Sequence, residues 1–120
     1  MSKYKNKLIV VDDITFSSQV EAKYYQQLKW SKEGKTLKSF ELQPKFILQE
    51  KFKKNGKHYR AITYTADFLV TGLDGKQEVI DIKGFPDQKF KIKQKLFEYK
   101  FPDLSLKVLY WTKKLGWHEK

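Results

Sequence analysis

Two apolar segments joined by a glycine-containing turn constrain the fold of this chain more than any other part of its sequence. Residues 64–70 and 78–83 are rich in β-branched and aromatic side chains. Gly72 and Gly75 lie between them, and Gly84 ends the second. Short apolar segments bounded by glycine are typical of β-strands that pair as a hairpin. The sequence therefore predicts a pair of antiparallel strands around which the rest of the chain is organised.

Each of the two predicted strands carries an aspartate between apolar neighbours. Asp81 and Lys83 are two residues apart, so they should share one face of their strand. The hairpin should bring Asp67 beside them. Two carboxylates supply the hard oxygen ligands that suit Mg²⁺, and an adjacent lysine can activate a water molecule or hold a phosphate. The simpler alternative is a solvated hairpin face with an incidental aspartate–lysine pair.

The charge of the chain indicates a polyanionic partner. Its 25 Lys and Arg residues outnumber 14 Asp and Glu residues, which gives a net charge of +11. This balance is typical of nucleic-acid-binding proteins. Charge that serves only solubility is one alternative. An anionic membrane surface is another, but no predicted helix has a basic face opposite a broad apolar face.

Cysteine content and hydropathy restrict the class of protein further. The chain has no cysteine, which excludes disulfides and thiolate metal sites. No apolar run approaches the ~18 residues of a membrane span. We therefore expect a cytoplasmic protein that does not enter the membrane, folded as a single domain over residues 1–120.

The first helix is predicted from an N-cap at Ser17 to Gly34. Apolar residues recur along it at helical spacing and should form its buried stripe: Val20, Tyr24 and Leu28. Glu21 borders this stripe. Its carboxylate can reach across to the sheet, or it can be an ordinary first-turn acid that the helix dipole favours.

Two long strands are predicted to precede the central hairpin, at residues 37–52 and 58–70. Pro44 has no N–H group to donate, which indicates an edge position or a bulge there. A basic turn at residues 51–57 contains an Asn-Gly pair, typical of a tight hairpin. In the first strand one face should hold Leu42, Phe46 and Leu48. In the second strand Asp67 should share a face with Thr63 and Thr65, opposite Tyr64, Ala66, Phe68 and Val70.

A second helix is predicted to begin at Pro86-Asp87 and to run to about Lys100. Residues at helical spacing, with Phe97 adjacent, should form its core face: Ile92, Leu96 and Tyr99. Lysines cover the remainder and could follow a nucleic-acid backbone. A final strand is expected at residues 104–111, followed by a short tail.

The expected order, helix-strand-strand-strand-helix-strand, resembles the restriction-endonuclease-like core of the PD-(D/E)xK nuclease superfamily. Asp67 matches the first motif aspartate, Asp81-Ile82-Lys83 matches the (D/E)-x-K motif, and Glu21 matches an acidic residue on the first helix. Ala66 stands where the motif name has proline. The chain is also similar to a small phage-encoded nuclease family in several stretches: residues 3–7, 16–18, 21–22, 41–46, 64–68, 81–84 and 93–97.

This resemblance implies an α/β fold of the α+β mixed-sheet type and a metal-dependent phosphodiesterase site. Together with the charge it leads us to expect a DNA endonuclease that uses Mg²⁺ or Mn²⁺. Asp67, Asp81 and Glu21 would bind the metal ion, and Lys83 would position or activate the attacking water. Residues expected to orient the site or contact the DNA backbone are Gln43, Arg60, Lys89, Lys91, Lys93 and Lys95.

Two alternatives share this fold: a DNA-binding protein without activity and a sequence-specific restriction endonuclease. The chain is short for extra recognition loops, which disfavours the second. Basic residues without a recognition helix should suit backbone shape better than base edges. We therefore expect a homodimer that prefers branched DNA, such as a Holliday junction, with Trp111 and Trp117 as candidates for the dimer interface.

Overall fold

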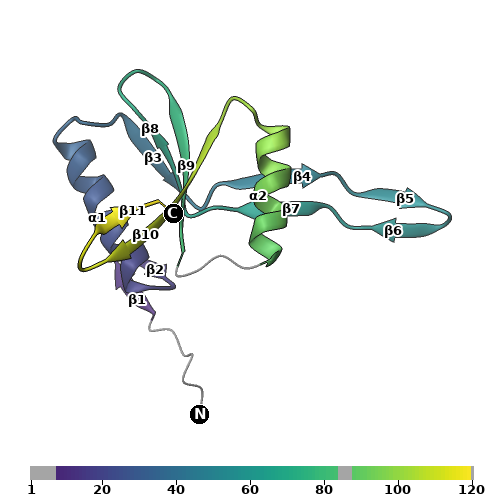
Figure 1. Cartoon of the computed structure of the whole chain (residues 1–120), viewed down its shortest axis with the longest axis horizontal. Coiled ribbons are helices and arrows are strands. Elements are labelled where there is room, and N and C mark those ends of the chain that lie inside the picture. The colour runs from purple at the N-terminus through teal and green to yellow at the C-terminus, as the bar shows by residue number, and fades with distance from the viewer. Residues whose placement is uncertain (1–7, 84–87, 120) are drawn as a thin grey trace, which may run out of the picture.

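The computed structural model describes residues 8–83 and 88–119, which form a mixed α/β fold around a mixed sheet (Figure 1). The main sheet has five strands in the order β11-β10-β9-β8-β3. β9 pairs antiparallel with β8 and parallel with β10, which places it at the centre. The bounds of these strands are β3 Ser39–Leu42, β8 Phe68–Thr71, β9 Gln77–Ile82, β10 Ser105–Thr112 and β11 Gly116–His118.

Two helices and three two-stranded ladders complete the described fold. The helices are α1 Gln19–Glu33 and α2 Gln88–Lys100. The ladders pair β1 with β2, β4 with β7, and β5 with β6. Their strands are β1 Ile9–Val11, β2 Ile14–Phe16, β4 Lys45–Gln49, β5 Phe52–Lys54, β6 Lys57–Tyr59 and β7 Ile62–Thr65. The mixed α/β class and the mixed sheet are confirmed.

The two helices lie on opposite sides of the central strand (Figure 1). Ile80 on β9 packs into the cluster beneath α1, and Val79 packs into the cluster beneath α2. Both side chains are almost completely buried. A strand covered on both faces has no solvent side, so Asp81 is buried as well, with 4% of its surface exposed.

The first helix begins one residue later than predicted. Ser18, not Ser17, is the N-cap, and its hydroxyl accepts the backbone N–H of Glu21 at 3.1 Å. The fully buried residues of α1 are Ala22, Tyr25 and Leu28. The buried side of the helix is therefore displaced from the predicted stripe. Leu28 is confirmed as buried, Tyr24 packs at the margin of the same cluster, and Val20 is half-buried. The cause of this displacement is β2, whose Phe16 ring packs on Tyr25 at 5.1 Å and shifts the buried side of the helix.

Both predicted long strands are broken at two points, and the breaks at residues 43–44 and 66–67 lie side by side. Gln43 has a φ of 50° and separates β3 from β4, so Pro44 lies between two strands, where an edge position or a bulge was expected. Ala66 and Asp67 separate β7 from β8. The Gln43 N–H donates to the Asp67 carbonyl at 2.9 Å, and the Ala66 N–H donates to the Pro44 carbonyl at 3.0 Å. We call this paired break the crossover, residues 43–44 and 66–67.

The crossover overturns the predicted strand faces. Leu42 packs in the α1 cluster, whereas Phe46 and Leu48 belong to the α2 cluster, although all three were assigned to one face. Likewise Tyr64 and Ala66 pack beneath α2, and Phe68 and Val70 pack beneath α1. Strict alternation fails here because the chain leaves one ladder and joins another.

The predicted core face of the second helix was right at Leu96 and Phe97, which pack in the α2 cluster, and wrong at Ile92 and Tyr99. Phe90 and Phe97 are buried, while Ile92 is 60% exposed and Tyr99 is 89% exposed. Phe97 packs edge-on against the Phe46 ring at 5.0 Å, so the aromatic residues of β4 and β7 determine which side of α2 faces inward. The predicted start at Pro86-Asp87 and the strand end at Gly84 lie outside the described residues.

The final strand is confirmed as β10, but the expected tail contains another strand. β11 pairs antiparallel with β10, and its Trp117 ring packs on Tyr24 at 4.9 Å. None of the helices in the described ranges is long and apolar enough to cross a membrane.

Exchanging Phe97 for alanine should destabilise the protein by about 3–5 kcal/mol, because it empties a fully buried aromatic site. The matched variant Ile92→Ala on the exposed side of α2 should change the free energy of unfolding by less than about 0.5 kcal/mol. Chemical denaturation of both variants measures the difference. Equal losses would contradict the inward face described for α2.

Candidate functional site

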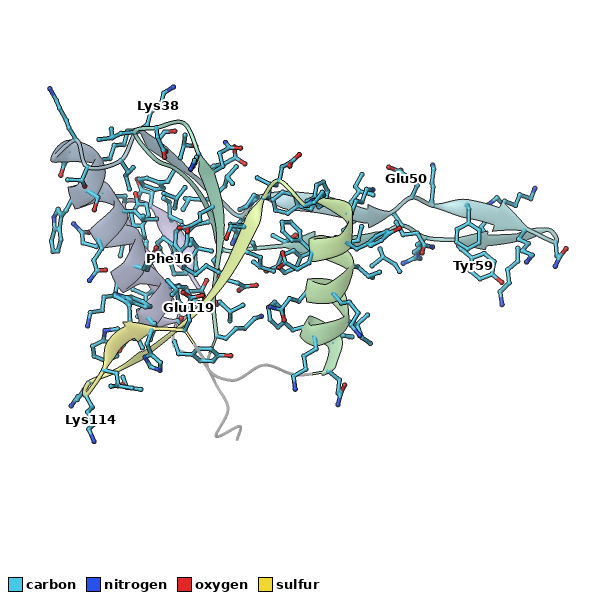
Figure 2. All side chains as sticks on the ribbon, turned by 45° about the horizontal axis from the view of Figure 1, so that its top comes forward. Phe16, Lys38, Glu50, Tyr59, Lys114 and Glu119 are labelled. Carbon is cyan, nitrogen blue, oxygen red and sulfur yellow. The ribbon has the colours of Figure 1, made fainter. Side chains whose placement is uncertain are left out.

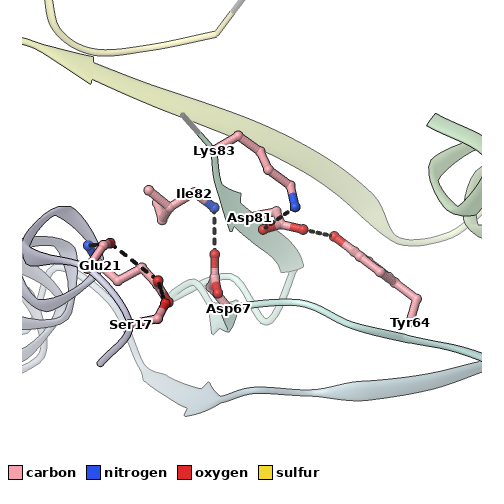
Figure 3. Close-up of polar contacts among 8 residues, drawn as sticks. Ser17, Glu21, Tyr64, Asp67, Asp81, Ile82 and Lys83 are labelled. Atoms are coloured by element: carbon pink, nitrogen blue, oxygen red, sulfur yellow. Dashed lines mark hydrogen bonds and ion pairs between the residues drawn. The ribbon is translucent and has the colours of Figure 1, made fainter. Parts of the chain in front are cut away.

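Asp67 lies at the crossover, where β8 stops pairing with β9. Its backbone N–H donates to the Ile80 carbonyl at 3.1 Å. Two residues further along β9, the Ile82 N–H donates to the carboxylate Oδ2 of Asp67 at 2.7 Å (Figure 3). The Asp67 side chain thus accepts the N–H that a backbone carbonyl of the neighbouring strand would otherwise accept. Asp67 is held against the central strand by its own backbone and side chain.

Asp81 is on β9, where it lies beside the Asp67 side chain and has two other partners. The Tyr64 hydroxyl donates to Asp81 Oδ2, and Lys83 Nζ lies 3.7 Å from Asp81 Oδ1 (Figure 3). The Lys83 ammonium also lies 4.3 Å from the centre of the Phe90 ring on α2. The predicted proximity of Asp67, Asp81 and Lys83 is therefore present, and the three side chains converge at the end of β9.

The close approach of the carboxylates perturbs proton binding. Burial raises the pKa of Asp67 well above its usual range, and the adjacent charge and hydrogen bond of Asp81 raise it further. The Ile82 N–H opposes this shift because it favours the ionised form. Burial and the charge of Asp81 also raise the pKa of Tyr64, so its hydroxyl stays protonated and donates to Asp81.

Glu21 and Gln43 share a small cavity with Asp67. Both residues line a space of about 90 Å³ together with Asp67. The Glu21 carboxylate accepts the Ser17 hydroxyl, and the Ser18 hydroxyl lies 3.3 Å from the same oxygen. Glu21 thus belongs to the helix cap and also faces the site. Gln43 is close because its backbone N–H binds Asp67.

The donor set suits a divalent cation that prefers oxygen ligands. Asp67 and Asp81 provide adjacent carboxylates, and a cation between them would relieve the repulsion that raises the pKa of Asp67. Within residues 8–83 and 88–119, no group of three His, Cys, Asp or Glu side chains is close enough to hold a metal ion. Mg²⁺ retains several waters and needs only one or two carboxylates, so Glu21 would act through water.

The predicted basic residues divide into three groups. Lys89 and Lys93 line a cavity of about 310 Å³ with Lys83, and the Thr63 and Thr65 side of β7 forms its opposite wall. Lys91 and Lys95 are exposed on α2 but do not line this cavity. Arg60 is exposed in the hairpin that extends from β4 and β7. Of the three lysines that line this cavity, Lys83 lies next to Asp81.

Tyr64 belongs to the site although its sequence position did not predict this. It was expected on an apolar face opposite Asp67, whereas its hydroxyl reaches Asp81. A buried tyrosine usually requires a hydrogen-bond partner, and this was the available signal. Ser18 was also missed, although Ser18 and Glu21 have the spacing of a capping box.

Replacing Asp67 with asparagine should stabilise the metal-free protein at neutral pH. The pKa of Asp67 in the folded wild type lies above its unfolded value of 3.8. The stability of the wild type therefore falls as the pH rises from the unfolded pKa to the folded pKa of Asp67. Asparagine keeps an oxygen for the Ile82 N–H but carries no charge. The stability that the variant gains over the wild type should therefore shrink as the pH falls towards about pH 4.

Thermal melts in chelator across this pH range measure the effect. The exposed Asp103→Asn exchange serves as the control. A loss of stability in the Asp67 variant at neutral pH, or a difference that is independent of pH, would contradict the account.

Comparison with known proteins gives one family. No curated protein matches the chain, and no solved structure matches it. The family described as "Protein of unknown function (DUF1064)" matches residues 1–117, which is nearly the whole chain. By this match the chain belongs to the DUF1064 family.

Proposed function

We propose that this protein is a divalent-metal-dependent DNA endonuclease that hydrolyses phosphodiester bonds. The observation that supports this most strongly is the convergence of Asp67, Asp81 and Lys83 at the end of a buried central strand. A carboxylate pair in such a position is costly for stability, because burial and mutual repulsion both disfavour ionisation. Binding of a cation at this pair offers a functional reason for the arrangement.

Asp67 and Asp81 would hold Mg²⁺ or Mn²⁺, with Glu21 as a further ligand through water. The ion would stabilise charge on the scissile phosphate and make a nucleophile available near neutral pH. The protein orients the two carboxylates from opposite sides. The Ile82 N–H fixes Asp67, and the Tyr64 hydroxyl fixes Asp81.

Lys83 would position the attacking water or offset charge on the phosphate. Its ammonium is held near Asp81 Oδ1 and over the Phe90 ring, so it has little freedom to move away. The adjacent cavity, with Lys89 and Lys93 on one wall and threonine hydroxyls on the other, is suited to a phosphate next to the cleaved bond.

DNA is the substrate that the charge favours. A net charge of +11 attracts any polyanion, and lysines on α2 would contact the backbone without reading sequence. A DNA-binding protein without activity would not need a buried carboxylate pair beside a lysine, so we favour the enzyme. Homodimer formation, a preference for branched DNA and a cytoplasmic location stay predictions.

The exchange Asp81→Asn should abolish cleavage while DNA binding persists or tightens. The exchange removes a metal ligand, but the basic surface that attracts DNA is unchanged, and one negative charge near the phosphate is lost. Plasmid nicking across a Mg²⁺ and Mn²⁺ titration, with binding measured in chelator, separates the two effects. The Asp103→Asn control should cut normally. Cleavage by the Asp81 variant at the wild-type rate would remove Asp81 from the site.

Replacing Lys83 with alanine should lower the single-turnover cleavage rate by about 10²-fold or more. DNA affinity should change little, because Lys83 is one of 25 Lys and Arg residues. The exposed Lys113→Ala exchange is the matched control. If affinity and rate fall equally, Lys83 holds phosphate only and takes no part in the chemical step.

A further inference from the structure

A thin hairpin extends from the folded body. We call residues 51–60, which contain β5 and β6, the arm (Figure 1). Every residue of the arm is exposed, and its two strands pair only with each other. Figure 2 shows the side chains of the arm, Tyr59 among them, standing clear of the helices. The arm therefore adds nothing to the two core clusters.

The arm nevertheless has a defined conformation. Asn55 and Gly56 have φ values of 51° and 74°, as the tight two-residue turn of a β-hairpin requires. Phe52 lies opposite Tyr59, and their rings stack at 4.6 Å with an interplanar angle of 9°. An isolated two-stranded hairpin is marginal in water, so this cross-strand pair is its main internal support.

The charges of the arm are all of one sign. Residues 51–60 contain no acidic residue, and their cations are Lys51, Lys53, Lys54, Lys57 and Arg60. Lys54 lies directly opposite Lys57 in the ladder, an arrangement that costs stability because like charges face each other. A polyanion bound along the arm would convert this repulsion into attraction.

We propose that the arm is a β-ribbon that lies along a groove of duplex DNA to one side of the cleavage site. This inference rests on the proposed function and extends it to the way in which the substrate is held. A two-stranded ribbon fits the major groove of B-DNA. The lysines contact phosphates at the groove edges, and the stacked Phe52–Tyr59 pair presents a flat apolar surface.

The connection between the arm and the site sets the position of these contacts. The arm continues through β7 to Asp67, so its tip and the carboxylates are ends of one stretch of chain. Thr65 lies ten positions after Asn55, and at ~3.3 Å per position this stretch spans at most roughly 33 Å. One turn of B-DNA measures about 34 Å. The arm therefore contacts DNA up to about one helical turn from the cleaved bond.

Salt dependence of binding tests the contribution of the arm. The triple variant K53Q/K54Q/K57Q removes three arm charges, and K38Q/K113Q/K114Q removes three exposed charges from other parts of the surface. Fluorescence anisotropy with a labelled duplex in chelator gives the slope of log affinity against log salt concentration. We expect the slope of the arm variant to become shallower by about 2–3 units, since each phosphate contact contributes about 0.9. The control should keep the wild-type slope.

The footprint of the protein, taken as the shortest duplex that gives full affinity, tests the reach of the arm in a series of duplexes of increasing length. Wild type and control should need about one helical turn more of duplex per protomer than the arm variant. Thermal melts should show that both variants are folded, because every exchanged residue is exposed.

The outcomes separate the arm from the proposed function. If wild type binds and cuts DNA but the two triple variants share one slope and one footprint, the inference about the arm is wrong and the endonuclease stands. If wild type binds no DNA, both are wrong. A shallower slope and a shortened footprint in the arm variant alone would support the inference.

Discussion

The hydrogen bond from the Ile82 N–H to the Asp67 carboxylate is the contact on which the arrangement of this protein depends. It forms because the chain leaves the β4–β7 ladder after Thr65 and joins β9 as β8 only from Phe68, so β9 has no β8 residue opposite Ile82. A side-chain acceptor takes the place of such a residue and keeps the buried N–H satisfied. The same contact brings a second carboxylate against Asp81. The hydrogen bond that satisfies the Ile82 N–H thus also places two carboxylates so close together that they repel each other in the candidate site.

The fold tolerates this repulsion because the stability of the central strand comes from elsewhere. Val79 and Ile80 bury opposite faces of β9 beneath α2 and α1, and the aromatic residues around Phe97 close the α2 side. Within the described chain the carboxylates are thus confined to the end of a strand that is already fixed by packing. The arrangement agrees with a site in which binding of a cation, and not folding alone, accounts for the charges.

Much of the site could be predicted because it depends on local periodicity. The two-residue spacing of Asp81 and Lys83 correctly places them on one side of β9, and the break at Pro44 follows from its missing N–H. The strand faces could not be predicted, because the crossover shifts alternation only where two segments meet in space. For the same reason the inward side of α2 was predicted only in part. Leu96 and Phe97 were expected there, but Phe90 also faces inward because it packs against Tyr64, which is distant in sequence.

The central claim is that the crossover assembles a divalent-cation site between Asp67 and Asp81, and anomalous diffraction from crystals grown with Mn²⁺ tests it most directly. The account predicts a manganese peak within ligand distance of carboxylate oxygens from both residues, with Glu21 close enough to bind through water. No peak at the carboxylate pair, or a peak bound only by exposed surface acids, would contradict it. The metal-dependent chemistry proposed here would then lose its structural basis.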